Sequence, residues 1–336
     1  MRRLVIALIG IVCLAALPSF AQKQFKIADR VKLGGEGGWD YLTYDADGHR
    51  LFITRGTHVM VVDTNTLKAS GDIPELSGIH GVALAPELNR GFVSNGGDNT
   101  VTVFDLKTLA KLDSIKVGER PDAILYDPFS KRVFTFNARS QDSTALDAAT
   151  GKVAGTVALG GKPEFPATDG KGKLYVNLED KGQIAQVDVS KLAVLNTWSI
   201  APCEEPSALA IDVEHHRLFS GCRNKMLAVI DSDSGKVVTT VPIGEGVDAG
   251  AFNPKTQEVF MSCGEGVLTV VHEDSPDKYT ARQNLATVRG ARTMALDKDN
   301  DAAYLVTAQR EDKPVAPGQR PGYVPGSFEL IVVKRE

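Results

Sequence analysis

The sequence predicts an all-β protein, a seven-bladed β-propeller with four-stranded antiparallel blades and a ring closed by the N-terminal strand. Three observations predict this fold. A phrase of about 42 residues returns seven times, a full repeat holds four short apolar segments rich in Val, Ile and Phe, and no segment sustains helical apolar spacing. A lone blade leaves both faces of its sheet open, and a closed ring of blades covers them.

A full repeat contains four strands in the same order. The first ends in a turn, the second resembles Arg50–Ile53, and the fourth ends near a glycine, as Val237–Ile243 does before Gly244. Seven residues mark the ends of the first strands at spacings of 40 to 44 residues: Asp45, Ala85, Asp127, Asp169, Asp212, Asn253 and Asp297. The third strand ends in an acid in five repeats, at Asp63, Asp105, Asp147, Asp188 and Asp231. This constant spacing predicts one blade per repeat.

The strand count predicts how the ring closes. The seventh repeat, from about Thr287, supplies three strands, of which the last is Phe328–Lys334, and the sequence stops without a fourth. Gln24–Leu33 precedes the first repeat and has no partner within it. We expect this segment to complete the seventh blade, so that residues 22–336 form a single propeller domain.

Residues 1–21 have the pattern of a cleaved signal peptide. Arg2 and Arg3 precede the apolar run Leu4–Leu17, which is short for a bilayer span, and Ser19 and Ala21 are small residues at the −3 and −1 positions. We expect cleavage after Ala21, a periplasmic or secreted protein, and no membrane span in the mature chain. The alternative is a retained anchor.

The net charge argues against nucleic acid as a partner. Lys and Arg total 38 against 42 Asp and Glu, a net charge of −4, and without Arg2 and Arg3 the balance is −6. A surface of this sign does not attract a phosphate backbone as a whole. We expect a monomer that binds a small polar ligand or an envelope protein.

Two stretches carry a resemblance to a known family. Lys173–Asn177 followed by Ala185–Asp188, and Gly91–Asn95 followed by Val101–Asp105, resemble the YVTN repeat. The chain is similar over essentially all of its mature length to bacterial YncE-like, seven-bladed YVTN β-propellers, and local phrases such as Pro202–Pro206 resemble an exported branch of them. This resemblance implies the fold and implies no reaction.

The best candidate site lies at one mouth of the axial channel. In a propeller the first strands line the channel, and the loops that lead into them gather around one opening. Eight charged or imidazole side chains fall in these loops: Asp40, His80, Arg120, Asp122, Glu164, Glu205, Asp248 and Arg292. They could bind a cation, bind a polar ligand through the arginines, or solvate one another as a cap. A divalent cation fits the acids, but the sequence requires no cofactor and selects no metal.

Two kinds of function fit these residues best. The first is a non-catalytic module that binds a ligand or a protein through the channel mouth. The alternative is a metal-dependent propeller enzyme, lactonase- or hydrolase-like, with an acid such as Glu164 or Asp248 as base. A third, less specific option is a scaffold role in an envelope assembly. No G-x-S-x-G, P-loop or H-E-x-x-H motif occurs, so no catalytic residue is assigned.

Export favours a disulfide, and three cysteines follow the leader. Cys203 leads into the fifth blade and Cys222 follows its second strand. Both then lie on the mouth face of one blade, and we predict a bridge between them. A Cys222–Cys263 bridge would cross between blades and is the second option. If Cys203 pairs with Cys222, Cys263 is a free thiol near the mouth.

Two further segments depart from the repeat. Residues 309–327 contain four prolines and cannot form a regular strand, so they are either a solvent loop or a lid over the channel. His215 and His216 fall in a turn on the opposite face. Adjacent side chains diverge in an extended chain, so we interpret the pair as a turn and not as two ligands of one ion.

Overall fold

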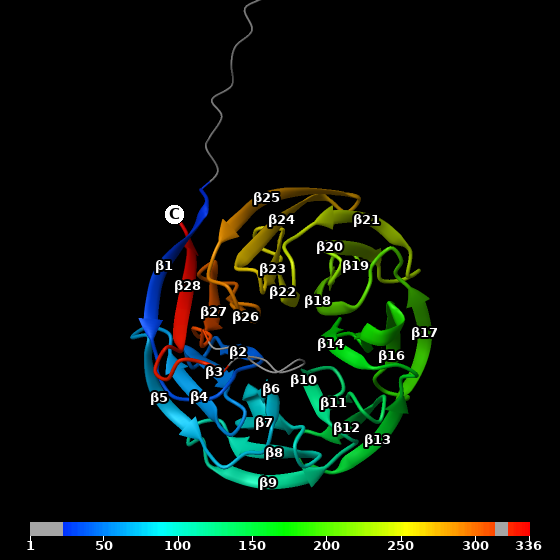
Figure 1. Ribbon diagram of the computed structural model, residues 1–336. Helices are drawn as coiled ribbons and strands as arrows, with labels where there is room; N and C mark the ends of the chain where they lie inside the picture. The colour runs from blue at the N-terminus through cyan, green and yellow to red at the C-terminus, as the bar shows by residue number, and fades with distance from the viewer. Residues whose placement is uncertain (1–22, 313–321) are drawn as a thin grey trace, which may run out of the picture.

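The computed structural model describes residues 23–312 and 322–336, and it confirms the predicted fold. Seven antiparallel sheets of four strands each stand around a central axis, and successive sheets follow one another around the ring (Figure 1). The signal peptide predicted for residues 1–21 lies outside the described residues. Across the two described ranges, no helix has the length and the hydrophobicity that crossing a bilayer requires.

Each blade runs from an inner strand at the axis to an outer strand at the rim. The first four blades are β2 (Leu42–Asp45), β3 (Arg50–Thr54), β4 (Val59–Asp63) and β5 (Lys68–Ile73); β6 (Ile79–Ala85), β7 (Arg90–Asn95), β8 (Thr100–Asp105) and β9 (Lys111–Lys116); β10 (Pro121–Asp127), β11 (Arg132–Asn137), β12 (Asp142–Asp147) and β13 (Val153–Ala158); and β14 (Pro163–Thr168), β15 (Lys173–Leu178), β16 (Gln183–Asp188) and β17 (Ala193–Ser199). The last three are β18 (Pro206–Asp212), β19 (Arg217–Cys222), β20 (Met226–Asp231) and β21 (Val237–Pro242); β22 (Val247–Asn253), β23 (Glu258–Cys263), β24 (Val267–Ser275) and β25 (Lys278–Ala286); and β26 (Met294–Asp297), β27 (Ala302–Thr307), β28 (Glu329–Arg335) and β1 (Phe25–Lys32).

The N-terminal strand closes the ring, as predicted. β1 pairs antiparallel with β28, from Phe25 opposite Arg335 to Lys32 opposite Glu329. Phe25 is buried, and its ring meets that of Phe260 in the sixth blade edge to face at 5.1 Å. The strand therefore completes the seventh blade and also packs against the sixth.

The acids that end the third strands form the turns that lead to the rim. The Oδ1 atom of Asp63 accepts hydrogen bonds from the backbone N–H and the hydroxyl of Thr66. Oδ1 of Asp147 accepts the same two hydrogen bonds from Thr150. The residue after each threonine takes a positive φ, 56° at Leu67 and 73° at Gly151. These contacts satisfy the turn backbone locally, which explains why an acid recurs at this position.

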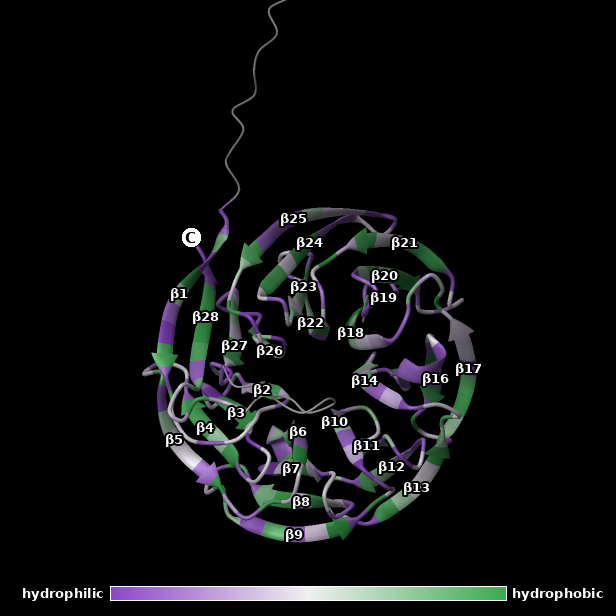
Figure 2. Ribbon diagram, viewed as in Figure 1, coloured by the Kyte–Doolittle hydropathy of each residue, from purple (hydrophilic) through white to green (hydrophobic). Residues whose placement is uncertain are grey.

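The middle strands of each blade are buried and the rim strand is exposed. β11 buries five of its six residues, whereas β9 at the rim exposes five of six and alternates hydrophilic and hydrophobic residues (Figure 2). Blades pack on one another through large side chains, such as Phe52 of the first blade against Phe104 of the second, with ring centroids 5.8 Å apart. Gly91 leaves room for that contact, because a Cβ atom there would lie 2.0 Å from the Phe104 ring.

The cysteines lie on the mouth side of the fifth and sixth blades. The Sγ atoms of Cys203 and Cys222 are 2.01 Å apart and form a disulfide within the fifth blade. Cys263 is a buried free thiol, and burial raises its pKa to about 12. A thiol with this pKa stays protonated at neutral pH and is a poor nucleophile.

Candidate functional site

The axial residues come from one position in every blade. At this position the chain passes a buried residue such as Pro121 or Val247, and the next side chain faces the axis. The seven residues at this position, called the axial ring below, are Asp40, His80, Asp122, Glu164, Ser207, Asp248 and Arg292. Six of them are polar groups that the sequence analysis singled out, and Ser207 is not.

A β-bulge places the ring residue in five of the blades. The pairing of β10 with β11 jumps from Pro121 to Ile124, so Asp122 lies in the irregular step. The same shift occurs at Glu164, between Pro163 and Pro166. It recurs at the ring positions of β6, β18 and β22. A bulge re-aims a side chain that regular pleating would place elsewhere, and here it turns the ring residues toward the axis.

Hydroxyl groups of neighbouring blades hold these irregular segments. The Thr54 hydroxyl donates to the carbonyl of His80 at 2.8 Å, and the Ser94 hydroxyl donates to the carbonyl of Asp122 at 2.5 Å. Ser262 makes the equivalent contact with the carbonyl of Arg292 at 2.5 Å. Each of these residues is buried in the second strand of the preceding blade, so the ring position of one blade is fixed by the blade before it.

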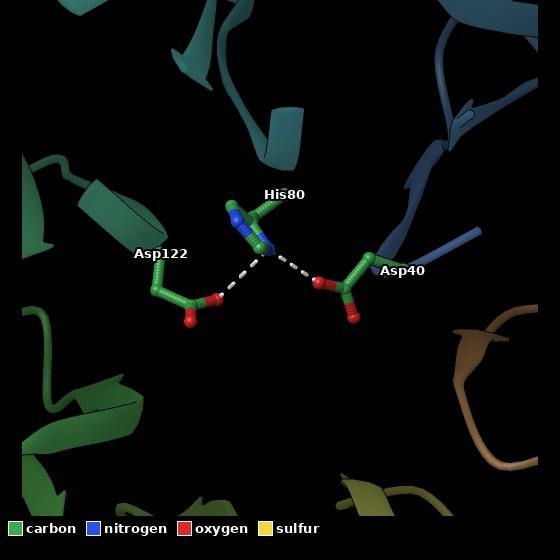
Figure 3. A group of neighbouring side chains, drawn as sticks. All are labelled: Asp40, His80 and Asp122. Atoms are coloured by element: carbon green, nitrogen blue, oxygen red, sulfur yellow. Dashed lines mark hydrogen bonds and ion pairs between the residues drawn. The ribbon is translucent and has the colours of Figure 1, made fainter. Parts of the chain in front are cut away.

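His80 joins two acids of the ring. Its Nδ1 atom lies 2.7 Å from Oδ2 of Asp40 and 3.4 Å from Oδ1 of Asp122, and the three side chains point toward one another (Figure 3). Burial by itself lowers the pKa of His80, but the hydrogen bond to Asp40 and the charge of Asp122 outweigh it and raise the pKa. Gly96 leaves room for the imidazole of His80, because a Cβ atom at residue 96 would lie 2.9 Å from it.

Arg292 is the cation on the other side of Asp40. Its Nε donates to Oδ2 of Asp248 at 2.6 Å, and its Nη2 donates to the carbonyl of Trp39 at 3.2 Å and lies 3.7 Å from Oδ1 of Asp40. Burial raises the pKa of Asp248 to about 6, although the charge of Arg292 opposes that rise. At neutral pH the Asp248–Arg292 pair is therefore ionised.

Glu164 is the least satisfied acid of the ring. Its Oε2 atom is buried and has no hydrogen-bond partner among the described residues, and Lys162 approaches it only to 3.5 Å while also bonding Glu179. Burial raises the pKa of Glu164 to about 8, and the charge of Asp122 adds to the rise. Free Glu164 is thus largely protonated at neutral pH.

An aromatic pair lies beside the acids. The rings of Tyr41, from the first blade, and Phe165, from the fourth, meet across the channel with centroids 5.3 Å apart. Burial raises the pKa of Tyr41 well above its ordinary value, and the charges of Glu164, Asp122, Asp40 and Asp248 add to the rise. Four carboxyl groups are therefore near this phenol, and the two rings form an apolar surface among them.

Arg55 fixes the segment that carries Asp40. Its buried guanidinium donates to four backbone carbonyls between residues 34 and 38, among them Glu36 at 2.8 Å and Gly38 at 3.1 Å. It also lies over the Phe328 ring, 3.6 Å from the centroid. Burial lowers the pKa of Arg55 to about 10. This loop thus reaches the axis in one conformation.

Two of the eight predicted site residues lie outside the axial ring. Arg120 and Glu205 are exposed and take positive φ values of 55° and 46°, each just before the proline that precedes a ring residue. Glu205 pairs with Arg223 at 3.4 Å. Ser207 was not predicted from the sequence. A proline directly precedes Asp122 and Glu164, and Pro206 precedes Ser207 in the same way, so this shared proline is a signal that could have identified it.

The prediction for residues 309–327 is tested only at its two ends, because residues 313–321 lie outside the described residues. Arg310 and Tyr323 form an isolated β-bridge. The Tyr323 ring packs on Trp39 with centroids 4.9 Å apart. The C-terminal end of this loop thus packs on Trp39, which directly precedes the axial-ring residue Asp40.

Comparisons with known proteins show the fold and one distant relative. No family model matches the chain, so the resemblance to YncE-like propellers stays a prediction. Antigen Lp49 of Leptospira interrogans serogroup Icterohaemorrhagiae serovar copenhageni is 27% identical over 260 residues, which cover 71% of this chain and 56% of that protein. The match thus spans about half the length of this curated relative.

Solved structures with the same fold are more remote in sequence. A chain of Kuenenia stuttgartiensis hydrazine synthase superposes with a TM-score of 0.71 at 17% identity, covering 87% of this chain and 96% of that one. A chain of a mitotic checkpoint complex superposes with a TM-score of 0.77 at 14% identity, covering 99% of both. At these identities the likeness concerns the fold alone, and the chain is a seven-bladed β-propeller distantly related to a Leptospira antigen.

Proposed function

We propose that this propeller is a non-catalytic binding module that takes an alkylammonium group at the axial ring. The observation that carries the proposal is the buried Oε2 atom of Glu164, which lacks a hydrogen-bond partner among the described residues and belongs to a ring of four acids. A buried polar atom without a partner is costly, and such atoms in native proteins often mark a ligand site.

The charge balance of the ring supports a cationic ligand. Four carboxyl groups face the axis, against Arg292 and His80, whose pKa is raised by the hydrogen bond to Asp40 and the charge of Asp122. Because free Glu164 is largely protonated at neutral pH, the three aspartates leave one negative charge in excess even when His80 is protonated, and ionisation of Glu164 on binding would add a second. An ammonium group offers three N–H donors to carboxylate oxygens, and it leaves no acceptor of its own to be satisfied.

The aromatic surface supports an organic cation over a bare ion. The rings of Tyr41 and Phe165 meet in the channel with four carboxyl groups near the Tyr41 phenol, and the negative face of an aromatic ring attracts a cation. The methylene groups of an alkylammonium ligand would cover the same rings. The ligand is either a free amine or the lysine side chain of an envelope protein, since both present this group.

Calorimetric titration tests the proposal and separates the two sources. We expect putrescine, a free diamine, or Nα-acetyl-lysine amide, a model of a protein lysine, to bind wild-type protein in a 1:1 ratio. Asp122→Asn and Asp248→Asn should each weaken binding at least tenfold, because each removes a charge-assisted hydrogen bond. Glu119→Gln, which changes an exposed acid, is the control. Absence of binding by both probes, or equal affinity in all variants, would contradict the proposal.

A metal-dependent enzyme is the second candidate. One specific observation favours it: ligand atoms of Asp40, His80 and Asp122 all lie within 4.8 Å of one another. Such a set of one imidazole and two carboxylates suits a divalent metal, and Glu164 would be the nearby acid or base. Lactone hydrolysis that requires added Mn²⁺ or Zn²⁺ and is lost in His80→Ala would establish this candidate in place of the binding module.

The distant relative and the predicted leader accord with the binding module. That relative is named as an antigen and not for a reaction. The signal peptide predicted for residues 1–21 would place the module in the periplasm or outside the cell.

A further inference from the structure

A second cluster of ligand-type side chains lies away from the axial ring, where the fifth blade meets the sixth. Asp212 ends β18, His215 follows in the turn toward β19, and Glu273 lies in β24. Nδ1 of His215 is 2.7 Å from Oδ2 of Asp212 and 3.4 Å from Oε1 of Glu273, and the Glu273 carboxyl lies against that of Asp212. The three ligand atoms are within 4.8 Å of one another.

The two adjacent histidines of this turn have different surroundings. His216 takes a positive φ of 57° and directs Nδ1 toward the exposed carboxyl of Asp233 at 2.7 Å. His215 turns the other way, onto two acids that are almost fully buried. The two side chains diverge, as expected from their adjacent positions, and His215 alone meets acids from two blades, which no pattern in the sequence indicates.

The charges of this cluster are not balanced by the contacts it makes. Oε1 of Glu273 accepts a hydrogen bond from the Tyr279 hydroxyl at 3.1 Å, but Oε2 is buried and has no hydrogen-bond partner in the described part of the chain. A single Nδ1–H can donate fully to only one of the two acids. The nearby Arg217 is engaged elsewhere, with Asp231 at 2.9 Å and Asp277 at 3.0 Å.

We infer that Asp212, His215 and Glu273 bind a divalent first-row transition metal ion that ties the fifth blade to the sixth. Two carboxylates balance the charge of such an ion, and one imidazole nitrogen with two carboxylate oxygens is a donor set that Zn²⁺ and Mn²⁺ accept. The ion takes the place of the proton on Nδ1 and gives the free Oε2 atom a partner. His215 is about one-third exposed, which leaves a way in from solvent.

Titration with Zn²⁺ tests this site once the axial histidine has been removed. In a His80→Ala background, which disables the Asp40–His80–Asp122 group, we expect one Zn²⁺ per chain by calorimetry. We also expect a rise in melting temperature of roughly 2–5 °C at saturation. Adding His215→Ala should weaken binding at least tenfold and abolish the rise, because it removes the only nitrogen ligand.

Two further variants distinguish a metal site from a structural contact. Adding His216→Ala to the His80→Ala background should leave Zn²⁺ binding unchanged, although it changes the same turn. Adding Glu273→Gln keeps the side-chain shape but removes a charge, so the variant should fold and bind Zn²⁺ at least tenfold more weakly. Failure of the His80→Ala protein to bind Zn²⁺, or equal binding with and without His215, would overturn the inference.

Discussion

Replacing Glu164 by glutamine should make the folded protein more stable at alkaline pH. Glu164 is about 15% exposed, its Oε2 atom has no hydrogen-bond partner among the described residues, and Asp122 and Asp248 add negative charge around it. Glutamine has almost the same shape and never ionises. Its amide therefore removes the cost of placing a charge there, while Lys162 keeps its contact with Glu179.

The size of the effect follows from the pKa of Glu164, which burial raises from 4.5 to about 8. Between these two values the folded state holds a proton that the unfolded state has released, so stability falls as pH rises through this window and levels off above it. Each tenfold change in the ionisation constant corresponds to about 1.4 kcal/mol. At pH 8, where the folded carboxyl is half ionised, Glu164→Gln should therefore exceed the wild type in unfolding free energy by on the order of 4 kcal/mol, and near pH 4.5 the two should be nearly equal.

Urea unfolding at pH 5 and at pH 8, followed by circular dichroism, measures this difference. Glu119→Gln changes an exposed acid on the same face and should shift the unfolding free energy by less than about 0.5 kcal/mol at either pH. A Glu164→Gln protein that is less stable than the wild type at pH 8 would refute the reasoning. A stability difference that does not change between pH 5 and pH 8 would refute it as well.

Three further predictions concern ligand binding at the axial ring, the closing strand β1 and the disulfide. Because a bound ammonium group favours ionised Glu164, the affinity for putrescine should rise by up to tenfold per pH unit between pH 6 and 8 in calorimetric titrations, and a flat profile would contradict this. Phe25→Ala should lower the free energy of unfolding in urea by about 3–5 kcal/mol, since the buried ring packs on Phe260; a loss below about 1 kcal/mol would show that β1 is not part of the cooperative fold. Replacing Cys203 and Cys222 by serine opens a loop of 19 residues and should cost about 3 kcal/mol in the same assay, and equal stability of the two proteins would contradict a stabilising bridge.

The blade pattern was predictable because it repeats at the level of local chemistry. Six of the seven residues expected to end a first strand do so, and the seventh, Asp169, lies one position beyond the end of β14 at Thr168. The acids that end the third strands recur because each satisfies its own turn, as Asp63 does with Thr66. Closure by β1 followed from counting strands, which needs no knowledge of side-chain contacts.

The membership of the axial ring was harder to predict, because it depends on bulges. Glu205 was expected among the mouth residues because it is charged, whereas the bulge that follows Pro206 gives the ring position to Ser207, an uncharged residue that a search for charged groups passes over. The pair Tyr41 and Phe165 was also missed. These residues belong to the first and fourth blades, and no local pattern links residues that face each other across a channel.

A crystal structure of the protein grown with putrescine tests the central claim most directly. The account predicts the diamine in the axial channel, with one nitrogen 2.7–3.2 Å from carboxyl oxygens of Asp122 or Glu164 and its methylene groups over Tyr41 and Phe165. A structure with an empty ring, or with the diamine bound only elsewhere on the surface, would contradict the claim that the axial ring recognises an ammonium group.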